Sequence, residues 1–347
     1  MNFKFLDGAT DYEIKKYIND NTDKINELAF YLAFYGKLEL INYLIDEKKL
    51  DINVKNERGE TVLFSACYGG KVDFFKYLVE KKKVNVNVKD KDGKTVLFAA
   101  CFIGNLEIIK YLIEEKKVNV NVKDNSGNTI LFSVCFFGNI NIMKYLIEEI
   151  KLDSNIKNKS GETVLFEACS MTNIEMVKCL TENGADVNVK DNFGRTVLFE
   201  AYRKTEVFKY LVEEKKVNVN VKDVSIGRTV LFDVCMDGNL ELVKILIENG
   251  ADVNVKDVLG QTALFKACEN GNRELLEYMI KHGADVNVAD NEGKSFLYFA
   301  KKNKYFNKDV VDYLKSVGAK EYIKVNKTQT SRSLLDSFLE TIKKYIH

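Results

Sequence analysis

Apolar and polar positions along the chain repeat with a period of 33 or 34 residues. Exact or altered copies of the string Thr-Val-Leu-Phe follow one another at intervals of 34, 34, 34, 33, 33, 33 and 33 residues, starting at Thr61, Thr95, Thr129, Thr163, Thr196, Thr229, Thr262 and Ser295. A fixed period of this size is typical of a solenoid, in which each unit stacks on its neighbours because it cannot bury its own apolar face. The period therefore predicts a tandem array and argues against a catalytic domain.

Within one unit, residues 95–128, the pattern predicts two helices and an arm. Thr95 follows a turn signal, and its hydroxyl suits the N-cap of a short helix that runs through Phe102. Apolar residues at helical spacing in Leu106–Ile113 predict a second, amphipathic helix. Strict alternation in Val118–Val122 predicts an extended arm that leads, through a turn, into the next unit.

This order of helix, turn, helix and extended finger resembles the ankyrin repeat, over about residues 27–322. The opening motif of that family corresponds to residues 93–101, and its middle motif to residues 238–246. Its closing motif, Asn-Gly-Ala-Asp-Val-Asn, is intact at residues 183–188 and 249–254. The resemblance implies an all-α solenoid of stacked helix-turn-helix units with β-hairpin-like fingers.

The departures from the family pattern are consistent along the chain. The family's Pro is replaced by Val or Ile. The family's His is replaced by Phe, as at Phe98, and this change implies apolar stacking between repeats instead of a polar bridge. Four units lack the helix-ending Gly and carry one extra residue, as in residues 80–84. In the unit that starts at Thr196, the turn between the helices is two residues shorter, and we expect the stack to be distorted there.

The predicted organisation is an N-terminal capping helix in residues 1–26, nine repeats in residues 27–322, and a linker with a C-terminal capping helix in residues 323–347. The repeats are expected at about 27–60, 61–94, 95–128, 129–162, 163–195, 196–228, 229–261, 262–294 and 295–322. Thr10 and Glu13 form a capping-box signal. Ser333–Tyr345 has an apolar stripe that we expect to fold back on the last repeat, and a partner- or membrane-docking helix is the alternative.

Charge and hydropathy exclude several classes of protein. The 52 Lys and Arg residues are interleaved with 51 Asp and Glu residues, which disfavours general nucleic-acid binding. The longest uncharged stretch, residues 125–143, is too polar for a membrane-spanning helix, and the start of the chain has no apolar run of signal-peptide length. These features predict a cytoplasmic monomer with no membrane span, and non-classical secretion stays open.

Six of the seven cysteines occupy one position in six repeats, namely Cys67, Cys101, Cys135, Cys169, Cys235 and Cys268. Stacked helices lie about 8–10 Å apart, whereas a disulfide needs Cα atoms within about 7 Å. We therefore expect these thiols to be reduced and buried, with no shared zinc ion. The two histidines, His282 and His347, cannot complete a catalytic set, so no enzyme activity, cofactor or metal site is predicted.

In ankyrin proteins, partners usually contact the finger tips and the exposed end of the first helix, on the concave side. The residues that match those positions and that we predict to bind a partner are Tyr68, Lys91, Asp92, Lys94, Phe102, Ile103, Phe136, Phe137, Met171 and Met236. Polar residues are usual at the helix ends, so an apolar row there indicates an interaction site. The alternative is that Phe102 and Phe136 pack against each other and only cover the cysteines.

The resemblance and the candidate site together predict a non-catalytic scaffold that binds a protein partner. A second interpretation is a host-directed effector or inhibitor that uses the same groove. The absence of proline among 347 residues suggests an A/T-rich coding sequence, as in some microbes and parasites. No cofactor is expected in either case.

Overall fold

The computed structural model describes residues 3, 6, 8–171, 173–302 and 308–322. The chain divides into two compact units, residues 1–159 and residues 160–347, which are considered separately. The predicted C-terminal helix, Ser333–Tyr345, lies outside the described residues. In the described part, the regular elements are helices, and β-pairing is limited to isolated bridges such as Lys55 with Thr61. The fold is therefore the predicted all-α array.

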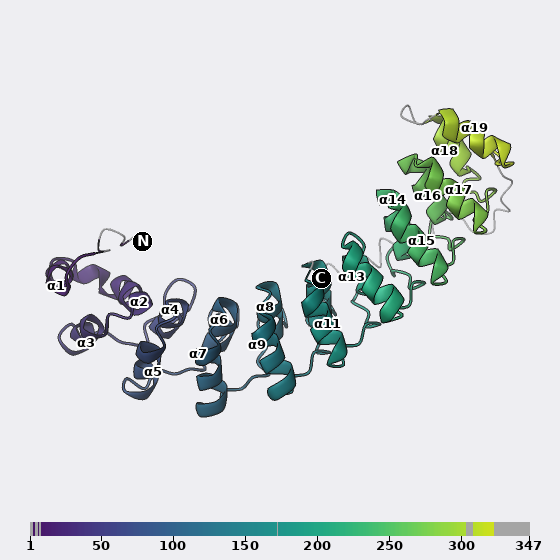
Figure 1. Ribbon diagram of the computed structural model, residues 1–347. Helices are drawn as coiled ribbons and strands as arrows, with labels where there is room; N and C mark the ends of the chain where they lie inside the picture. The colour runs from purple at the N-terminus through teal and green to yellow at the C-terminus, as the bar shows by residue number, and fades with distance from the viewer. Residues whose placement is uncertain (1–2, 4–5, 7, 172, 303–307, 323–347) are drawn as a thin grey trace. The chain divides into compact units, whose positions relative to one another are not determined.

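The first unit begins with a capped helix and continues with helix pairs. Thr10 and Glu13 form the predicted capping box, and Thr10 precedes the first helix. The helices are α1 (Asp11–Asp20), η2 (Thr22–Lys24), α2 (Ile25–Tyr35), α3 (Leu38–Asp46), α4 (Val62–Tyr68), α5 (Val72–Glu80), α6 (Val96–Ile103), α7 (Leu106–Lys110), η3 (Tyr111–Glu115), α8 (Ile130–Phe136), α9 (Ile140–Lys144) and η4 (Tyr145–Glu149). The first helices of the pairs, α2, α4, α6 and α8, contact one another in order (Figure 1).

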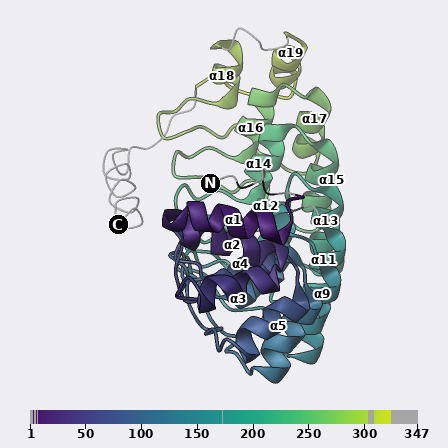
Figure 2. The same cartoon turned by 90° about the vertical axis from the view of Figure 1, so that its left-hand side faces the viewer.

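The second unit repeats the same pairing. Its helices are α10 (Val164–Ser170), α11 (Ile174–Glu182), α12 (Leu198–Ala201), α13 (Thr205–Lys209), η5 (Tyr210–Glu214), α14 (Val230–Asp237), α15 (Leu240–Glu248), α16 (Ala263–Asn270), α17 (Arg273–Lys281), α18 (Phe296–Lys302) and α19 (Lys308–Ser316). Helix α12 has only four residues, in the repeat whose inter-helix turn is two residues shorter. In Figure 2 the loops project on the side of α14 and α16, while α13, α15 and α17 lie on the other side.

The core of each unit is built from the repeated apolar positions. Phe98 is 2% exposed, and the equivalent Phe64 and Phe232 are equally hidden, so the phenylalanines that replace the family's His do stack inside. All seven cysteines are buried. Burial raises the pKa of the Cys67 and Cys101 thiols. The burial of the cysteines and the raised pKa of these thiols both fit the prediction that the thiols are structural.

Because the thiols are buried and protonated, native protein is expected to react with a thiol reagent such as Ellman's reagent many times more slowly than denatured protein. All seven cysteines should react once the chain is unfolded in guanidinium chloride. Fast modification of several thiols in the native state, or fewer than seven thiols in the denatured state, would contradict this picture.

Two local predictions need correction. The hydroxyl of Thr95 does not cap its helix, although Thr95 stands at the N-cap position and its carbonyl accepts a hydrogen bond from the Phe98 amide at 2.9 Å. Asn side chains cap the second helices α7, α9, α11, α15 and α17 by accepting from a helical amide, as Asn105 does from Ile108 at 3.0 Å. The arm Val118–Val122 is not extended throughout, because it contains a turn in which the Asn121 amide donates to the Asn119 side chain at 2.9 Å.

The extra residue at the end of the second helix is accommodated by a wider turn. The Lys116 amide bonds to the Tyr111 carbonyl, five residues earlier, and Lys117 then adopts a φ of 52°. The same left-handed lysine occurs five times, at Lys49, Lys83, Lys117, Lys151 and Lys216, one more than the four units counted from the sequence. Units without the extra residue place a glycine at this turn, such as Gly250 with a φ of 86°.

Replacing Lys83 with glycine is expected to raise the free energy of unfolding by about 0.5–1 kcal/mol, because glycine adopts a positive φ without the steric cost that a Cβ brings. Lys83 has a φ of 57° and is exposed. The control is Lys81→Gly, where φ is −93° and glycine should lower stability by a similar amount. Urea denaturation measures the free energy of unfolding of both variants. Equal changes in Lys83→Gly and Lys81→Gly would contradict the prediction.

Candidate functional site

The aromatic residues predicted at the helix ends form one cluster in the first unit. Phe102, Phe136 and Phe137 are 51%, 56% and 45% exposed. The ring of Phe102 lies 4.2 Å from that of Phe137, which lies 4.9 Å from Phe136, while Tyr68 approaches Phe102 at 6.4 Å between centroids. The alternative considered from the sequence paired Phe102 directly with Phe136, whereas in the structure each of these rings contacts Phe137. We call Tyr68, Phe102, Phe136 and Phe137 the aromatic patch.

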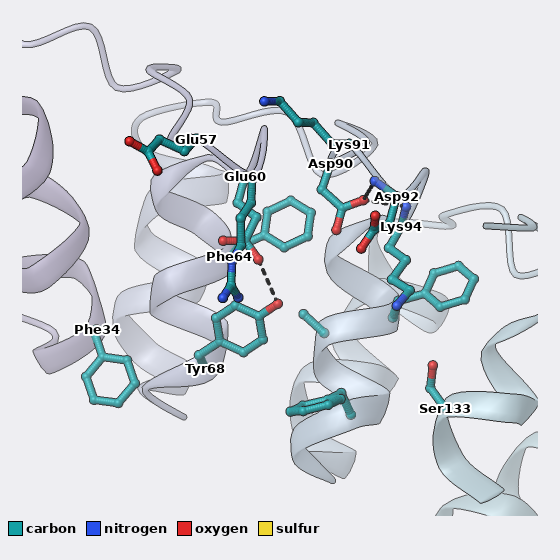
Figure 3. Close-up of a pocket in the computed structure, with 14 residues that line it drawn as sticks. Phe34, Glu57, Glu60, Phe64, Tyr68, Asp90, Lys91, Asp92, Lys94 and Ser133 are labelled. Carbon is teal, nitrogen blue, oxygen red and sulfur yellow. Dashed lines mark hydrogen bonds between the residues drawn. The ribbon is translucent and has the colours of Figure 1, made fainter. Parts of the chain in front are cut away.

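A cavity of about 670 Å³ opens beside this patch. Its walls come from the first helices α2, α4, α6 and α8 and from two fingers, and they include Phe34, Tyr68, Phe102, Lys91, Asp92 and Lys94. Figure 3 shows Phe34 and Tyr68 on neighbouring helices and the charged finger residues above them. None of the residues that line this cavity is a histidine or a cysteine.

Hydrogen bonds hold the polar side of the cavity in place. The Tyr68 hydroxyl donates to Glu60 Oε1 at 3.0 Å (Figure 3). Asn56 Nδ2 donates to Glu60 Oε2 at 2.8 Å. Burial, together with the negative charge of Glu60, raises the pKa of Tyr68, so the phenol stays protonated and remains a donor. Asp90 accepts from the amides of Asp92 and Lys94, which fixes the finger tip. The cavity is preorganised by these contacts.

The remaining candidate residues are placed as follows. Ile103 is half-buried, and Lys91 and Asp92 are exposed at the finger tip. Met171 and Met236 belong to the second unit, where they are 39% and 45% exposed, and the repeat that contains α12 and α13 separates them. The structure thus brings eight of the ten candidates together in the first unit and leaves the two methionines apart from each other.

Sequence reasoning missed part of this site. Phe34 and Tyr35, at the end of α2, are 43% and 41% exposed. Phe34 and Tyr35 stand 34 residues before Tyr68 and Gly69, so the repeat period could have identified them as the same helix-end positions. A second cavity of about 810 Å³, next to the first, is lined by both residues and shares Tyr68 and Glu60 with it. The apolar surface therefore begins one repeat earlier than predicted.

No helix among the described residues has the length and apolar character needed to cross a membrane.

Comparison with curated proteins returns no match. The family model described as ankyrin repeats (3 copies) matches residues 29–124, 116–191, 135–223, 173–257 and 231–328. These overlapping matches cover most of the 347 residues and coincide with the stacked helix pairs. The chain belongs to the ankyrin repeat family.

Proposed function

We propose that this chain is a non-catalytic scaffold that binds a protein partner through the aromatic patch and the cavity beside it. Ankyrin repeats are in general protein–protein interaction modules, and the family is typically non-catalytic. The observation that carries the proposal is the cluster of three half-exposed phenylalanines at helix ends, with rings in contact. Contiguous apolar surface of this kind is costly to leave in water and is characteristic of interaction sites. Rigid aromatic side chains also supply most interface hot spots.

Serine substitution of Phe102, Phe136 and Phe137 together is expected to reduce partner capture at least about tenfold, since hot-spot truncations cost 2 kcal/mol or more. Tagged native chain and the triple variant would be used to capture proteins from cell lysate, with quantitative mass spectrometry as the readout. The control carries Tyr12→Ser and Leu38→Ser, two apolar residues that are 78% and 40% exposed on α1 and α3, away from the patch. Equal recovery of every protein by all three chains would refute the proposal.

A further inference from the structure

The five repeats that carry the extra residue share a tyrosine on their second helix. It stands six residues before the left-handed lysine in each of them, at Tyr43, Tyr77, Tyr111, Tyr145 and Tyr210. Four repeats have a glycine at the end of the second helix instead. Two of these have Tyr278 and Tyr313 at the tyrosine position, and the other two have Cys179 and Ile245. Every repeat with the extra residue therefore has the tyrosine, whereas only half of the glycine repeats do.

The wide turn is closed on this tyrosine. In all five repeats the backbone amide five residues later donates to the tyrosine carbonyl, as Lys116 does to Tyr111 at 3.1 Å. In a glycine repeat the donor lies only four residues later, as in the bond of 3.1 Å from the Asn249 amide to the Ile245 carbonyl. The extra residue therefore gives the helix a different last turn, with a side chain of its own above the tyrosine.

The contacts of Tyr111 show what this turn brings together. Its ring is only 2% exposed, and Lys116 Nζ from the wide turn lies 5.0 Å from the ring centroid. Lys76 Nζ, from the preceding repeat, lies 5.4 Å from the same centroid. The Tyr111 hydroxyl donates to Glu80 Oε1 at 3.1 Å, and Lys116 Nζ lies 3.5 Å from that oxygen. We call Tyr111, Lys116, Lys76 and Glu80 the tyrosine clamp.

The clamp joins two repeats through attractive contacts. Lys76 and Glu80 belong to α5, whereas Tyr111 and Lys116 belong to the end of the next second helix. A cation near an aromatic ring is attracted to its face, and a hydrogen bond to a charged group is stronger than one between neutral groups. The bond from Tyr111, together with the charge of Lys116, lowers the pKa of Glu80, so its carboxylate stays ionised as the acceptor.

Related contacts link the neighbouring second helices of the first unit. The Tyr77 hydroxyl donates to Asn42 Oδ1 at 2.8 Å in the repeat before it. The Tyr145 hydroxyl donates to Glu114 Oε1 at 2.8 Å, and Lys110 Nζ lies 4.9 Å from the Tyr145 ring centroid. The extra residue and the tyrosine occur in four successive repeats here, so these links run through the unit that carries the aromatic patch.

We propose that the extra residue is part of a conformational device, in which the tyrosine clamp locks each second helix to the one before it. The first unit then opens as a block instead of one repeat at a time. This inference goes beyond the proposed binding function and does not depend on it. The alternative is a tolerated insertion, in which case the glycine turn would be at least as stable, because glycine adopts a positive φ without steric cost.

The decisive variant gives the clamp repeat the glycine turn of residues 182–184, through Glu115→Asn, Lys116→Gly and deletion of Lys117 in the full chain. Hydrogen exchange followed by mass spectrometry reports the opening of each helix. We expect the amides of α5, in the preceding repeat, to exchange at least about tenfold faster than in the native chain. Tyr111→Phe, which removes only the hydroxyl, and Lys116→Met, which removes only the charge, should each accelerate this exchange about threefold to tenfold.

Lys117→Gly is the matched control, because it keeps the extra residue and relieves the φ of 52°. Exchange in α5 should be no faster in this control than in the native chain. The difference between the native chain and Lys116→Met should shrink to about half or less in 1 M sodium chloride, since salt screens partly exposed charges. Circular dichroism checks folding, and the two point variants decide the question if the shortened variant does not fold.

Three results would overturn the proposal. One is exchange in the shortened variant as slow as in the native chain, which would make the extra residue a tolerated insertion. Another is native exchange rates in both Tyr111→Phe and Lys116→Met. The third is faster exchange that is confined to the altered repeat and leaves α5 unchanged, because the clamp would then not couple the two repeats.

Discussion

Replacement of Phe98 by alanine is expected to lower the free energy of unfolding by about 3–5 kcal/mol, the range observed when buried phenylalanines are truncated. The ring is 2% exposed on α6, a helix that contacts α4 and α8 on its two sides. Loss of the ring leaves a void that stacked helices cannot close without moving past one another. Urea denaturation followed by circular dichroism measures the effect.

Phe102 provides the matched control, because it lies one helical turn further along the same helix and is 51% exposed. Phe102→Ala should lower stability by only about 1–1.5 kcal/mol, since about half of the side chain remains in water after folding. The two substitutions delete the same atoms, so any difference reports burial alone. Similar losses in both variants would show that the aromatic patch belongs to the core and would remove the basis for a binding role.

Gly69→Ala is expected to destabilise the first two repeats by about 3 kcal/mol, the upper end of the cost of overpacking. A Cβ at Gly69 would lie 2.7 Å from the carbonyl carbon of Phe34 and still closer to its oxygen. Because the obstacle is backbone in the neighbouring repeat, α2 would have to move as a whole. Hydrogen exchange should show faster exchange in α2 and α4, together with a lower unfolding midpoint.

The neighbouring Gly70 serves as the comparison. It has a φ of 64°, and a Cβ there would meet nothing closer than 3.9 Å. Gly70→Ala should therefore cost only about 1 kcal/mol, from the left-handed backbone conformation. If Gly70→Ala proves as damaging as Gly69→Ala, the close approach of Phe34 to Gly69 is not the cause.

The helix pairs could be predicted because the repeated apolar positions report directly on which faces are buried. Phe98 and its equivalents are buried as the pattern indicated, and the capping box at Thr10 is present. The wide turn before Lys117 could not be foreseen, because a π-type turn changes the backbone path without changing the order of apolar residues. The cap by Asn105 and the absence of one by the Thr95 hydroxyl were missed, because both residue types suit an N-cap and the sequence does not show which of them is used.

The candidate site was predictable only in part. Helix-end position identified Phe102, Phe136 and Phe137, but it could not reveal that Phe137 separates the other two rings. The cavity depends on how Tyr68 turns toward Glu60, which is a matter of side-chain packing between repeats. The predicted repeat boundaries, and the capping of the stack by its terminal helices, stay predictions.

The most direct test of the central claim measures binding and stability on the same proteins. The main partner captured by the native chain would be purified, and its dissociation constant determined for the native chain and for Phe102→Ser/Phe136→Ser/Phe137→Ser, alongside the melting temperature of each. If the aromatic patch is the partner surface, the dissociation constant should rise at least about tenfold while the melting temperature stays within about 2 °C. An unchanged dissociation constant, or a large fall in melting temperature, would contradict the account.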